Sequence, residues 1–252
     1  MEIIKTLLLS AIIFIPLERI LTLRTQKILR RNWLNDIVFS VANGYAVSFT
    51  LALLILGVTF VANLWLPGLR SAVSFQPIWL QFIEIMFLAD LGFYFAHRAM
   101  HTVPFLWRIH MIHHSVEDLD WLAGARAHPF DVILLKSASF MPVFALGFSS
   151  GALGAFLLLY VWQSTFQHSN VSLRLGPGLR WLLASPEFHH WHHSKDPAVR
   201  DKNFAGQLPF LDLIFRTAHM PAGRRPETFG VDDPMRQNYL SQLGRPFRHD
   251  EK

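Results

Sequence analysis

The sequence concentrates histidine in short groups with regular spacing. HMIHH, residues 110–114, and HHWHH, residues 189–193, share the spacing H-x-x-H-H, and HRAMH, residues 97–101, adds a pair four positions apart. Residues three and four positions apart share a face of an α-helix, so each group predicts imidazole rings side by side. Crowded imidazoles repel one another once protonated, whereas a metal ion binds neutral imidazole and removes that repulsion. The spacing therefore predicts a metal site.

The number of histidines predicts two metal ions rather than one. Eleven of the 13 histidines lie between residues 97 and 193, and the three groups with one isolated histidine would supply eight or nine nitrogen ligands. Imidazole suits iron, zinc, copper and nickel. The chain has no cysteine, which excludes thiolate zinc sites, cysteine-ligated iron–sulfur clusters, disulfides and a cysteine nucleophile.

An isolated histidine is more often structural or solvated than a ligand, and we expect this of His219 and His249. His128 leaves three alternatives open. It could be a metal ligand, a residue that orients a ligand, or a ring that packs against Pro129.

The composition is typical of a membrane protein. Apolar residues make up 52% of the chain and charged residues only 16%, whereas soluble domains have about 25% charged residues. The formal net charge of +5 suits nucleic acid or an anionic membrane surface. Because the chain is so apolar and carries no nucleic-acid-binding motif, we expect a membrane and no nucleic acid partner.

The apolar runs predict membrane-spanning helices. Residues 36–66 and 78–96 are long enough to span a bilayer, which needs about 20 residues. Residues 129–148 and 151–167 are separated by a short turn and predict a tight helical hairpin. The run 3–23 contains a proline and charged residues, so it either spans weakly or lies at the interface, and it lacks a signal-peptide pattern. The expected fold is all-α, an integral membrane helical bundle with a cytoplasmic helical cap that carries the histidine groups.

The distribution of Lys and Arg orients this bundle. The segment 24–35 has four positive residues, the loop 67–77 has one, and the turn 149–151 has none. Most of the others lie in 97–128 and 169–252. By the positive-inside rule, the basic segments, and the metal site with them, are expected on the cytoplasmic side.

Asp90 is a further candidate, because a carboxylate inside a spanning helix is costly and usually functional. It precedes His97 by seven residues, so it would lie on the same helical face, two turns deeper. There it could accept a hydrogen bond from the second ring nitrogen of a ligand, directly or through water. The alternatives are solvation at the interface or another partner in the bundle. Four residues that flank the histidine groups could play a similar supporting part: Glu187, Arg126, Asp201 and Asn203.

These residues together resemble a known family. The series HRAMH, HMIHH, FQHSN and EFHHWHH, with DLGFYFAHR and DKNFAG beside it, is similar to the fatty acid hydroxylase/sterol desaturase superfamily of integral membrane non-haem di-iron enzymes. The similarity covers about residues 85–217. It implies nine metal ligands, namely His97, His101, His110, His113, His114, His168, His189, His192 and His193. His190 is left out because relatives often have another residue there, and His128 belongs to a motif that only some branches share.

The chain departs from parts of this family in two places. Only His168 occupies the position where fatty acid 2-hydroxylases have a second H-x-x-x-H, which favours the sterol desaturase-like and alkylglycerol monooxygenase-like branches. FLDLIFRTAH lacks the W-D-x-x-F-G-T form common in relatives. The expected organisation is N-terminal transmembrane helices in 1–76, a catalytic domain in 77–217 and a polar C-terminal tail in 218–252.

The resemblance implies that two iron ions use O2 to hydroxylate or desaturate a C–H bond of a lipid, such as a sterol-like, fatty acyl or ether lipid. Zinc could replace iron on purification. The chain has no flavin fingerprint, no cysteine for a ferredoxin cluster and no cytochrome b5 domain. We therefore expect a separate electron donor, cytochrome b5-, ferredoxin- or reductase-like, that docks on the basic face.

Two other functional classes stay open on the sequence alone. A histidine-lined metal transporter would place its site near the middle of the bilayer. A zinc-dependent membrane hydrolase would use three protein ligands and an open position, and H-E-x-x-H is absent. The number and kind of bound metal ions separate the three classes.

Overall fold

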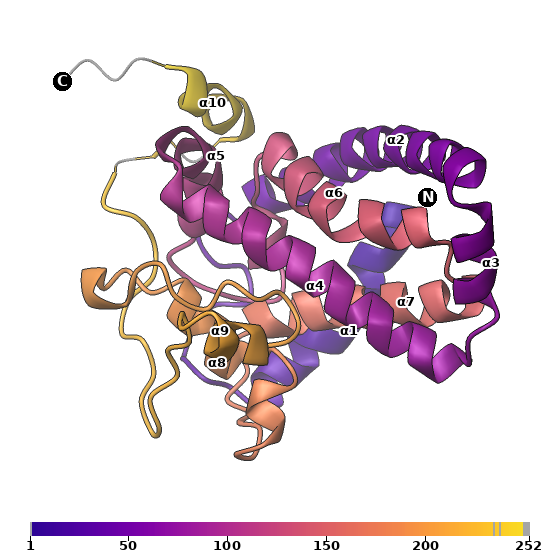
Figure 1. Cartoon of the computed structure of the whole chain (residues 1–252). Helices are drawn as coiled ribbons and strands as arrows, with labels where there is room; N and C mark the ends of the chain where they lie inside the picture. The colour runs from indigo at the N-terminus through magenta and orange to yellow at the C-terminus, as the bar shows by residue number, and fades with distance from the viewer. Residues whose placement is uncertain (1, 234, 237, 249–252) are drawn as a thin grey trace.

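The computed structural model describes residues 2–233, 235–236 and 238–248, and the regular elements in these residues are all helical (Figure 1). The prediction of an all-α chain is thus confirmed. The long helices are α1 (Glu2–Ile20), α2 (Trp33–Trp65), α4 (Ile78–Thr102), α6 (Pro129–Leu146) and α7 (Ser150–His168). The short ones are α3 (Pro67–Ser74), α5 (Pro104–His114), α8 (Pro186–His192), α9 (Phe210–Ile214) and α10 (Tyr239–Gly244), with 3-10 turns η1 (Ala123–Ala125), η2 (Leu179–Trp181), η3 (Pro197–Val199) and η4 (Arg245–Phe247).

Three of the described helices, α2, α4 and α6, are long and apolar enough to cross a membrane. The 33 residues of α2 extend for about 50 Å at 1.5 Å per residue, which exceeds the roughly 30 Å of a bilayer core. The helices α1 and α7 form where the sequence predicted them but do not meet both criteria.

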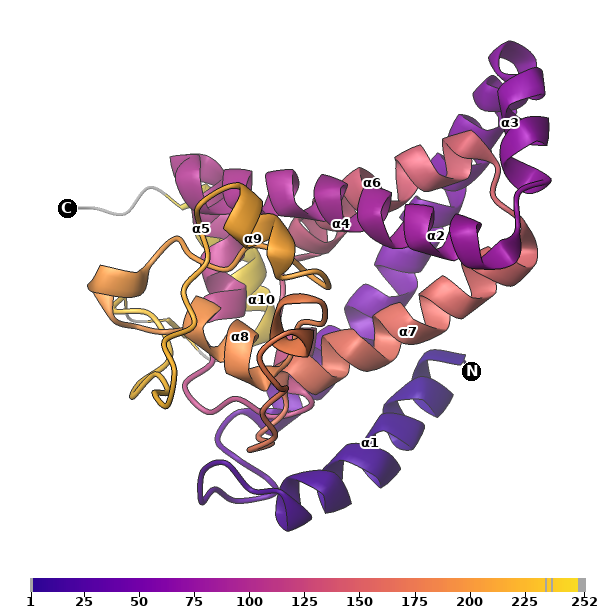
Figure 2. The ribbon, with the colours of Figure 1, turned by 60° about the horizontal axis from the view of Figure 1, so that its bottom comes forward.

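Helix α4 packs against α6, α7 and α5, and in Figure 2 it lies beside α6 along the upper edge of the bundle. Its buried side chains recur every three or four residues and form one stripe that leads from Gln81 through Ile85 and Ala89 to His97. At Gly92 the backbone of α4 passes so close to α6 that a Cβ atom would lie 2.1 Å from the carbonyl oxygen of Ala138. This close approach requires glycine.

We expect Gly92→Ala to destabilise the bundle, because the added methyl group would force α4 and α6 apart. Overpacking of this kind costs about 1–3 kcal/mol, and more where the obstacle is backbone. Thermal unfolding of the purified protein in detergent measures the effect. Gly57→Ala and Gly154→Ala are matched controls, since a Cβ atom at either position meets nothing within 4 Å. An unchanged melting temperature for Gly92→Ala would contradict the close packing of α4 on α6.

The predicted tight hairpin of 129–148 and 151–167 is more open than expected. Helix α6 ends at Leu146. The next residue, Gly147, has a φ of 76°, which requires the conformational freedom of glycine, and Ser149 caps the start of α7. From this turn the two helices diverge, and α4 packs against both (Figure 2). Large rings fill the space between them, as at Phe140 and Tyr160, whose ring centroids are 5.3 Å apart.

The short helices other than α3 gather at one end of the bundle, and α3 lies at the opposite end (Figures 1 and 2). Both α5 and α8 begin with a proline at the first helical turn, where the missing N–H costs nothing. The described part of 218–252 packs here as well: the side chain of Asn35 donates to Gln242 over 3.0 Å, and the Tyr239 hydroxyl donates to Asn43 over 3.2 Å. His249 lies outside the described residues.

A buried ionic network ties this end to α2. The Asp36 carboxylate accepts from Arg126 and, over 2.7 Å, from Arg30, and Arg30 also donates to Asp120 over 2.8 Å. All four side chains are almost completely buried. The network fixes the segment between α5 and α6 against the start of α2.

Candidate metal centre

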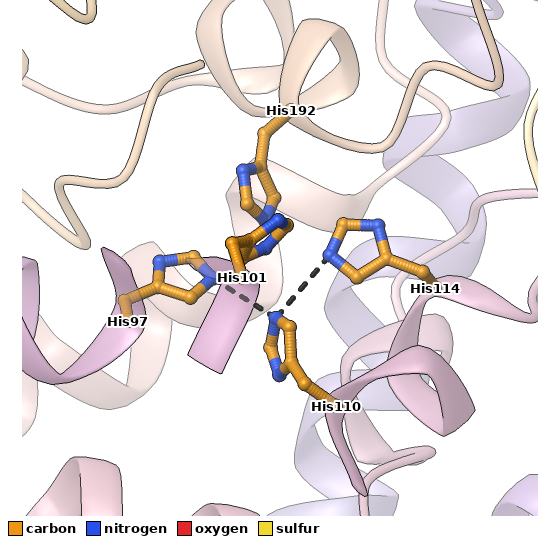
Figure 3. A group of neighbouring side chains, drawn as sticks. All are labelled: His97, His101, His110, His114 and His192. Atoms are coloured by element: carbon orange, nitrogen blue, oxygen red, sulfur yellow. Dashed lines mark hydrogen bonds between the residues drawn. The ribbon is translucent and has the colours of Figure 1, made fainter. Parts of the chain in front are cut away.

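Helices α4, α5 and α8 bring five histidines together, which we call the first group (Figure 3). It consists of His97, His101, His110, His114 and His192, and one ring nitrogen from each lies within 4.8 Å of the others. The Nε2 atom of His110 is 3.1 Å from Nε2 of His97 and 3.2 Å from Nε2 of His114. Their arrangement around one point is typical of a metal site.

Four further histidines, from α5, α7, α8 and the residue that follows α8, form the second group. They are His113, His168, His189 and His193, with one ring nitrogen from each again within 4.8 Å of the others. The Nε2 atom of His168 is 3.3 Å from that of His113 and 2.9 Å from that of His189. The Nε2 atom of His189 is in turn 3.1 Å from that of His193.

The two groups are adjacent, and each H-x-x-H-H spacing contributes to both. The ring centroids of His114 and His193, which belong to different groups, are 4.6 Å apart. On α5, His110 and His114 belong to the first group and His113 to the second, whereas on α8 only His192 belongs to the first. The prediction that each motif places its imidazoles side by side is therefore refined, because one histidine of each motif belongs to a different group from the other two.

The outer nitrogens of six rings show which ring atom carries the proton. The Nδ1 atoms of His97, His113 and His168 donate to the backbone carbonyls of Phe204, Arg126 and Ser164 over 2.8, 3.1 and 2.8 Å. The Nδ1 atom of His192 donates to the Lys202 carbonyl, and those of His101 and His110 donate to Asp201 and Asp131. A carbonyl or carboxylate can only accept, so each neutral ring directs an unprotonated Nε2 inward.

Facing lone pairs make a cation between them favourable. His168 and His113 direct unprotonated Nε2 atoms at each other over 3.3 Å, and a hydrogen bond there would require one charged ring. Ligand nitrogens at about 2.0–2.1 Å from a metal ion lie roughly 3.0–3.4 Å apart, which matches these distances. The Nε2 atoms of His101 and His192 are buried without a hydrogen-bond partner among the described residues. These features fit two bound metal ions.

Burial favours the neutral form of His113, His189 and His193. Loss of solvent, and then the neighbouring His110, lowers the pKa of His113 to about 4. Burial, followed by adjacent histidines, lowers the pKa of His189 and of His193 well below the usual value. Neutral imidazole is the form that binds metal, so the rings are ready to bind at neutral pH.

Comparison with known proteins identifies the family. The model of the family described as fatty acid hydroxylase matches residues 82–217, more than half of the chain. The chain belongs to the fatty acid hydroxylase family. The resemblance found in the histidine spacing is thereby confirmed.

Several curated relatives of this fatty acid hydroxylase family member act on lipids by name. An ornithine lipid hydroxylase of Rhizobium tropici is 30% identical over 84% of this chain and 65% of its own length. Human alkylglycerol monooxygenase is 30% identical over 64% of this chain and 34% of its own length. A C-4 methylsterol oxidase of Schizosaccharomyces pombe is 29% identical over 60% and 52%. The chain thus spans less than two thirds of each of these relatives, and no solved structure matches it significantly.

Asp131 contacts a histidine of the first group in this family member and was not among the residues predicted from the sequence. It lies in the first turn of α6, is buried, and accepts from Nδ1 of His110 over 2.8 Å. The signal that could have found it is the one used for Asp90, a carboxylate within an apolar helix. Its position opposite a histidine depends on how α6 packs against α5, which the sequence does not reveal.

Asp90 does not contact a histidine ring in the way we expected. Its carboxylate accepts from the backbone N–H groups of Gly206, Gln207 and Leu208 over 2.7, 3.0 and 2.7 Å. The same loop provides the Phe204 carbonyl that accepts from His97. Asp90 therefore stabilises this loop and does not contact a histidine ring directly.

The other expected supporting residues divide into two kinds. Asp201 contacts His101 directly over 3.2 Å, and Arg126 contacts His113 through its carbonyl. Asn203 and Glu187 instead stabilise the chain around α8: Asn203 donates to the Phe188 carbonyl and Glu187 pairs with Arg180 over 3.2 Å.

His128 and His190 join neither group. His128 caps α6 by accepting from the Phe130 N–H, and its other nitrogen donates to the Leu243 carbonyl over 3.2 Å. His190 packs against Phe229, with ring centroids 5.4 Å apart, and belongs to neither group. His219, expected to be structural, packs against Trp191 with ring centroids 4.8 Å apart.

A cavity of about 470 Å³ opens onto both groups. It lies among α1, α2, α6 and α7, and its wall includes His97 and His110 of the first group and His113, His168 and His189 of the second. Apolar side chains such as Leu7, Val47 and Leu135 line much of the remaining wall. A cavity of this size and character suits a ligand with an apolar chain.

Proposed function

We propose that this chain is a multi-pass membrane oxidoreductase that uses O2 and two iron ions to hydroxylate or desaturate a C–H bond of a lipid. The observation that carries the proposal is the meeting of two buried, all-histidine groups at the wall of one largely apolar cavity. The names of the relatives support it, since all three act on lipids by name.

We propose the nine histidines of the two groups as the metal ligands. Bound there, the two iron ions would supply the oxidising power, and iron suits imidazole ligands. The carbonyls and carboxylates around the groups hold the proton on Nδ1 in six of the nine rings and fix the orientation of those six rings. The apolar cavity wall would position the lipid chain beside the groups and exclude water.

We further propose that the histidine groups lie on the cytoplasmic side, as the distribution of Lys and Arg suggests. Residues 77–217 would form the catalytic unit, with 1–76 as N-terminal membrane helices and 218–252 as a C-terminal segment. Electrons would come from a separate donor, cytochrome b5-, ferredoxin- or reductase-like, on the basic face. Turnover by the purified protein with NAD(P)H alone would contradict this part of the proposal.

The two alternatives have less support. A transporter site would lie near the middle of the spanning helices, whereas both groups lie where the short helices α5 and α8 gather. A zinc hydrolase needs three ligands and an open position, whereas the groups have five and four histidines.

Asp131 provides a test of how the first group is supported. We expect Asp131→Ala to weaken binding of one metal ion by about 10–100-fold, the usual effect of losing the acceptor behind a ligand histidine. Asp131→Asn should preserve part of the affinity, because the amide oxygen can still accept from His110. Competition with a chelator measures both, and Ser139→Ala, a buried serine on the same helix, is the control. Equal metal affinity in Asp131→Ala and the wild type would contradict this role.

Lipid analysis of a host that expresses the protein tests the reaction. The wild type should add one oxygen atom to a lipid or remove two hydrogen atoms, and His113→Ala should abolish that change. His128→Asn, which can still cap α6, should leave it intact. If a competent donor is present and no lipid changes in a histidine-dependent way, the enzyme proposal is wrong.

A further inference from the structure

The cavity beside the histidine groups contains a lysine. Asp131, Val132, Leu135 and Lys136 form one stripe of α6 along the cavity wall. Lys136 follows Asp131 by five residues, or about 7.5 Å along the helix axis. Lys136 therefore lies in the middle of an apolar helix and lines the same cavity as the histidines.

Lys136 forms no hydrogen bond or ion pair with any other residue that the structure describes. The two acidic residues of the cavity wall are engaged elsewhere: Asp131 accepts from His110, and the exposed Glu2 pairs with Lys5 over 2.8 Å. A cation inside a spanning helix is costly unless it is paired. An anionic occupant of the cavity would supply the partner that the described part of the chain does not provide.

The cavity wall also offers hydroxyl groups. Tyr160 and Ser164 of α7 and Ser40 of α2 line the same cavity. A hydroxyl can donate to the oxygens of a carboxylate or a phosphate, and a lysine adds a charge-assisted hydrogen bond. The rest of the wall is largely apolar, so the occupant combines an anionic oxygen group with an apolar chain.

We propose that Lys136 is a specificity-determining residue that binds the carboxylate or phosphate of an anionic lipid in this cavity. The proposal rests on the proposed function only in taking this cavity as the substrate site. Binding through Lys136 requires neither iron nor O2. If Lys136 served only the structure of the protein, the affinity for a lipid would not depend on the charge of that lipid.

Binding of four single-chain probes to the purified protein in detergent tests the proposal. The probes are radiolabelled hexadecanoate, hexadecyl phosphate, hexadecan-1-ol and hexadecyltrimethylammonium, which share one chain length. We expect the wild type to bind at least one anionic probe about tenfold more tightly than the alcohol. Lys136→Met should lose that preference, Lys136→Arg should retain it, and binding of the alcohol should be the same in all three proteins.

The two anionic probes distinguish a carboxylate from a phosphate as the group recognised. The proposal is wrong if the wild type binds the alcohol or the cationic probe as tightly as both anionic probes, a result that needs no variant. It is equally wrong if Lys136→Met keeps the anionic preference. Lys136→Gln is the second variant, should Lys136→Met fail to fold. Failure of lipid oxidation would leave these binding results unchanged, so the two proposals fail separately.

Discussion

His189→Ala is expected to remove one metal ion and to abolish lipid oxidation. His189 lies within the second group, with its Nε2 atom 2.9 Å from that of His168 and 3.1 Å from that of His193. Only three histidines would then remain around this ion, while the five of the first group would be intact. We therefore expect about one metal ion per chain in place of two, and a loss of product well beyond the 10–100-fold that follows loss of a supporting residue.

His190→Ala is the matched control for this substitution. It removes the neighbouring imidazole from the same helix, α8, but His190 belongs to neither group. This variant should keep both metal ions and its activity. If His189→Ala retained two metal ions, or if His190→Ala lost one as readily, the assignment of the second group would be wrong.

Asp36→Asn is expected to destabilise the whole protein. The Asp36 carboxylate is fully buried and accepts from both Arg30 and Arg126, whose side chains are also buried. Without the negative charge of Asp36, the positive charges of two buried arginines are no longer neutralised in full. Breaking a buried ion pair costs about 3–5 kcal/mol. The carbonyl of Arg126 accepts from His113, so the second metal ion should also be held more weakly.

Thermal unfolding in detergent and metal content after purification measure these two effects of Asp36→Asn. Glu84→Gln is the control, because Glu84 is a partly exposed carboxylate on α4 whose contact with Gln76 survives as an amide hydrogen bond. We expect a large loss of stability for Asp36→Asn and little change for Glu84→Gln. Equal stability of the two variants would show that the network contributes nothing to the fold.

The sequence indicated which histidines lie close together, because the spacing of the histidines and the positions of the apolar runs can both be read from it. H-x-x-H-H places rings on one side of a helix, and the apolar runs bring those helices to one end of the bundle. The division of each motif between two groups was not predictable, since it depends on how α5 and α8 are rotated against α4. His128 illustrates the same limit: the cap of α6 and the contact with Leu243 both arise from packing.

Charged residues within the apolar helices were harder to interpret. Asp90 was recognised as unusual, but its partners are backbone N–H groups of a loop more than 100 residues later in the chain. Asp131 and Asp36 carry the same signal, and their partners became apparent only with the tertiary structure. The C-terminal segment was expected to be a polar tail, yet the side chains of Tyr239 and Gln242 contact α2. That a side chain is polar does not show which residue it will bond to, so these contacts could not be predicted.

The metal content of the wild-type protein tests the central claim most directly. The chain contains seven methionines and no cysteine, so sulfur measures the protein in the same elemental analysis as the metals. Protein purified anaerobically from iron-replete cells is expected to contain two iron atoms for every seven sulfur atoms, and one metal ion fewer in His189→Ala. One zinc ion per chain that is insensitive to His189→Ala, or no stoichiometric metal at all, would contradict a two-metal centre built from the two histidine groups.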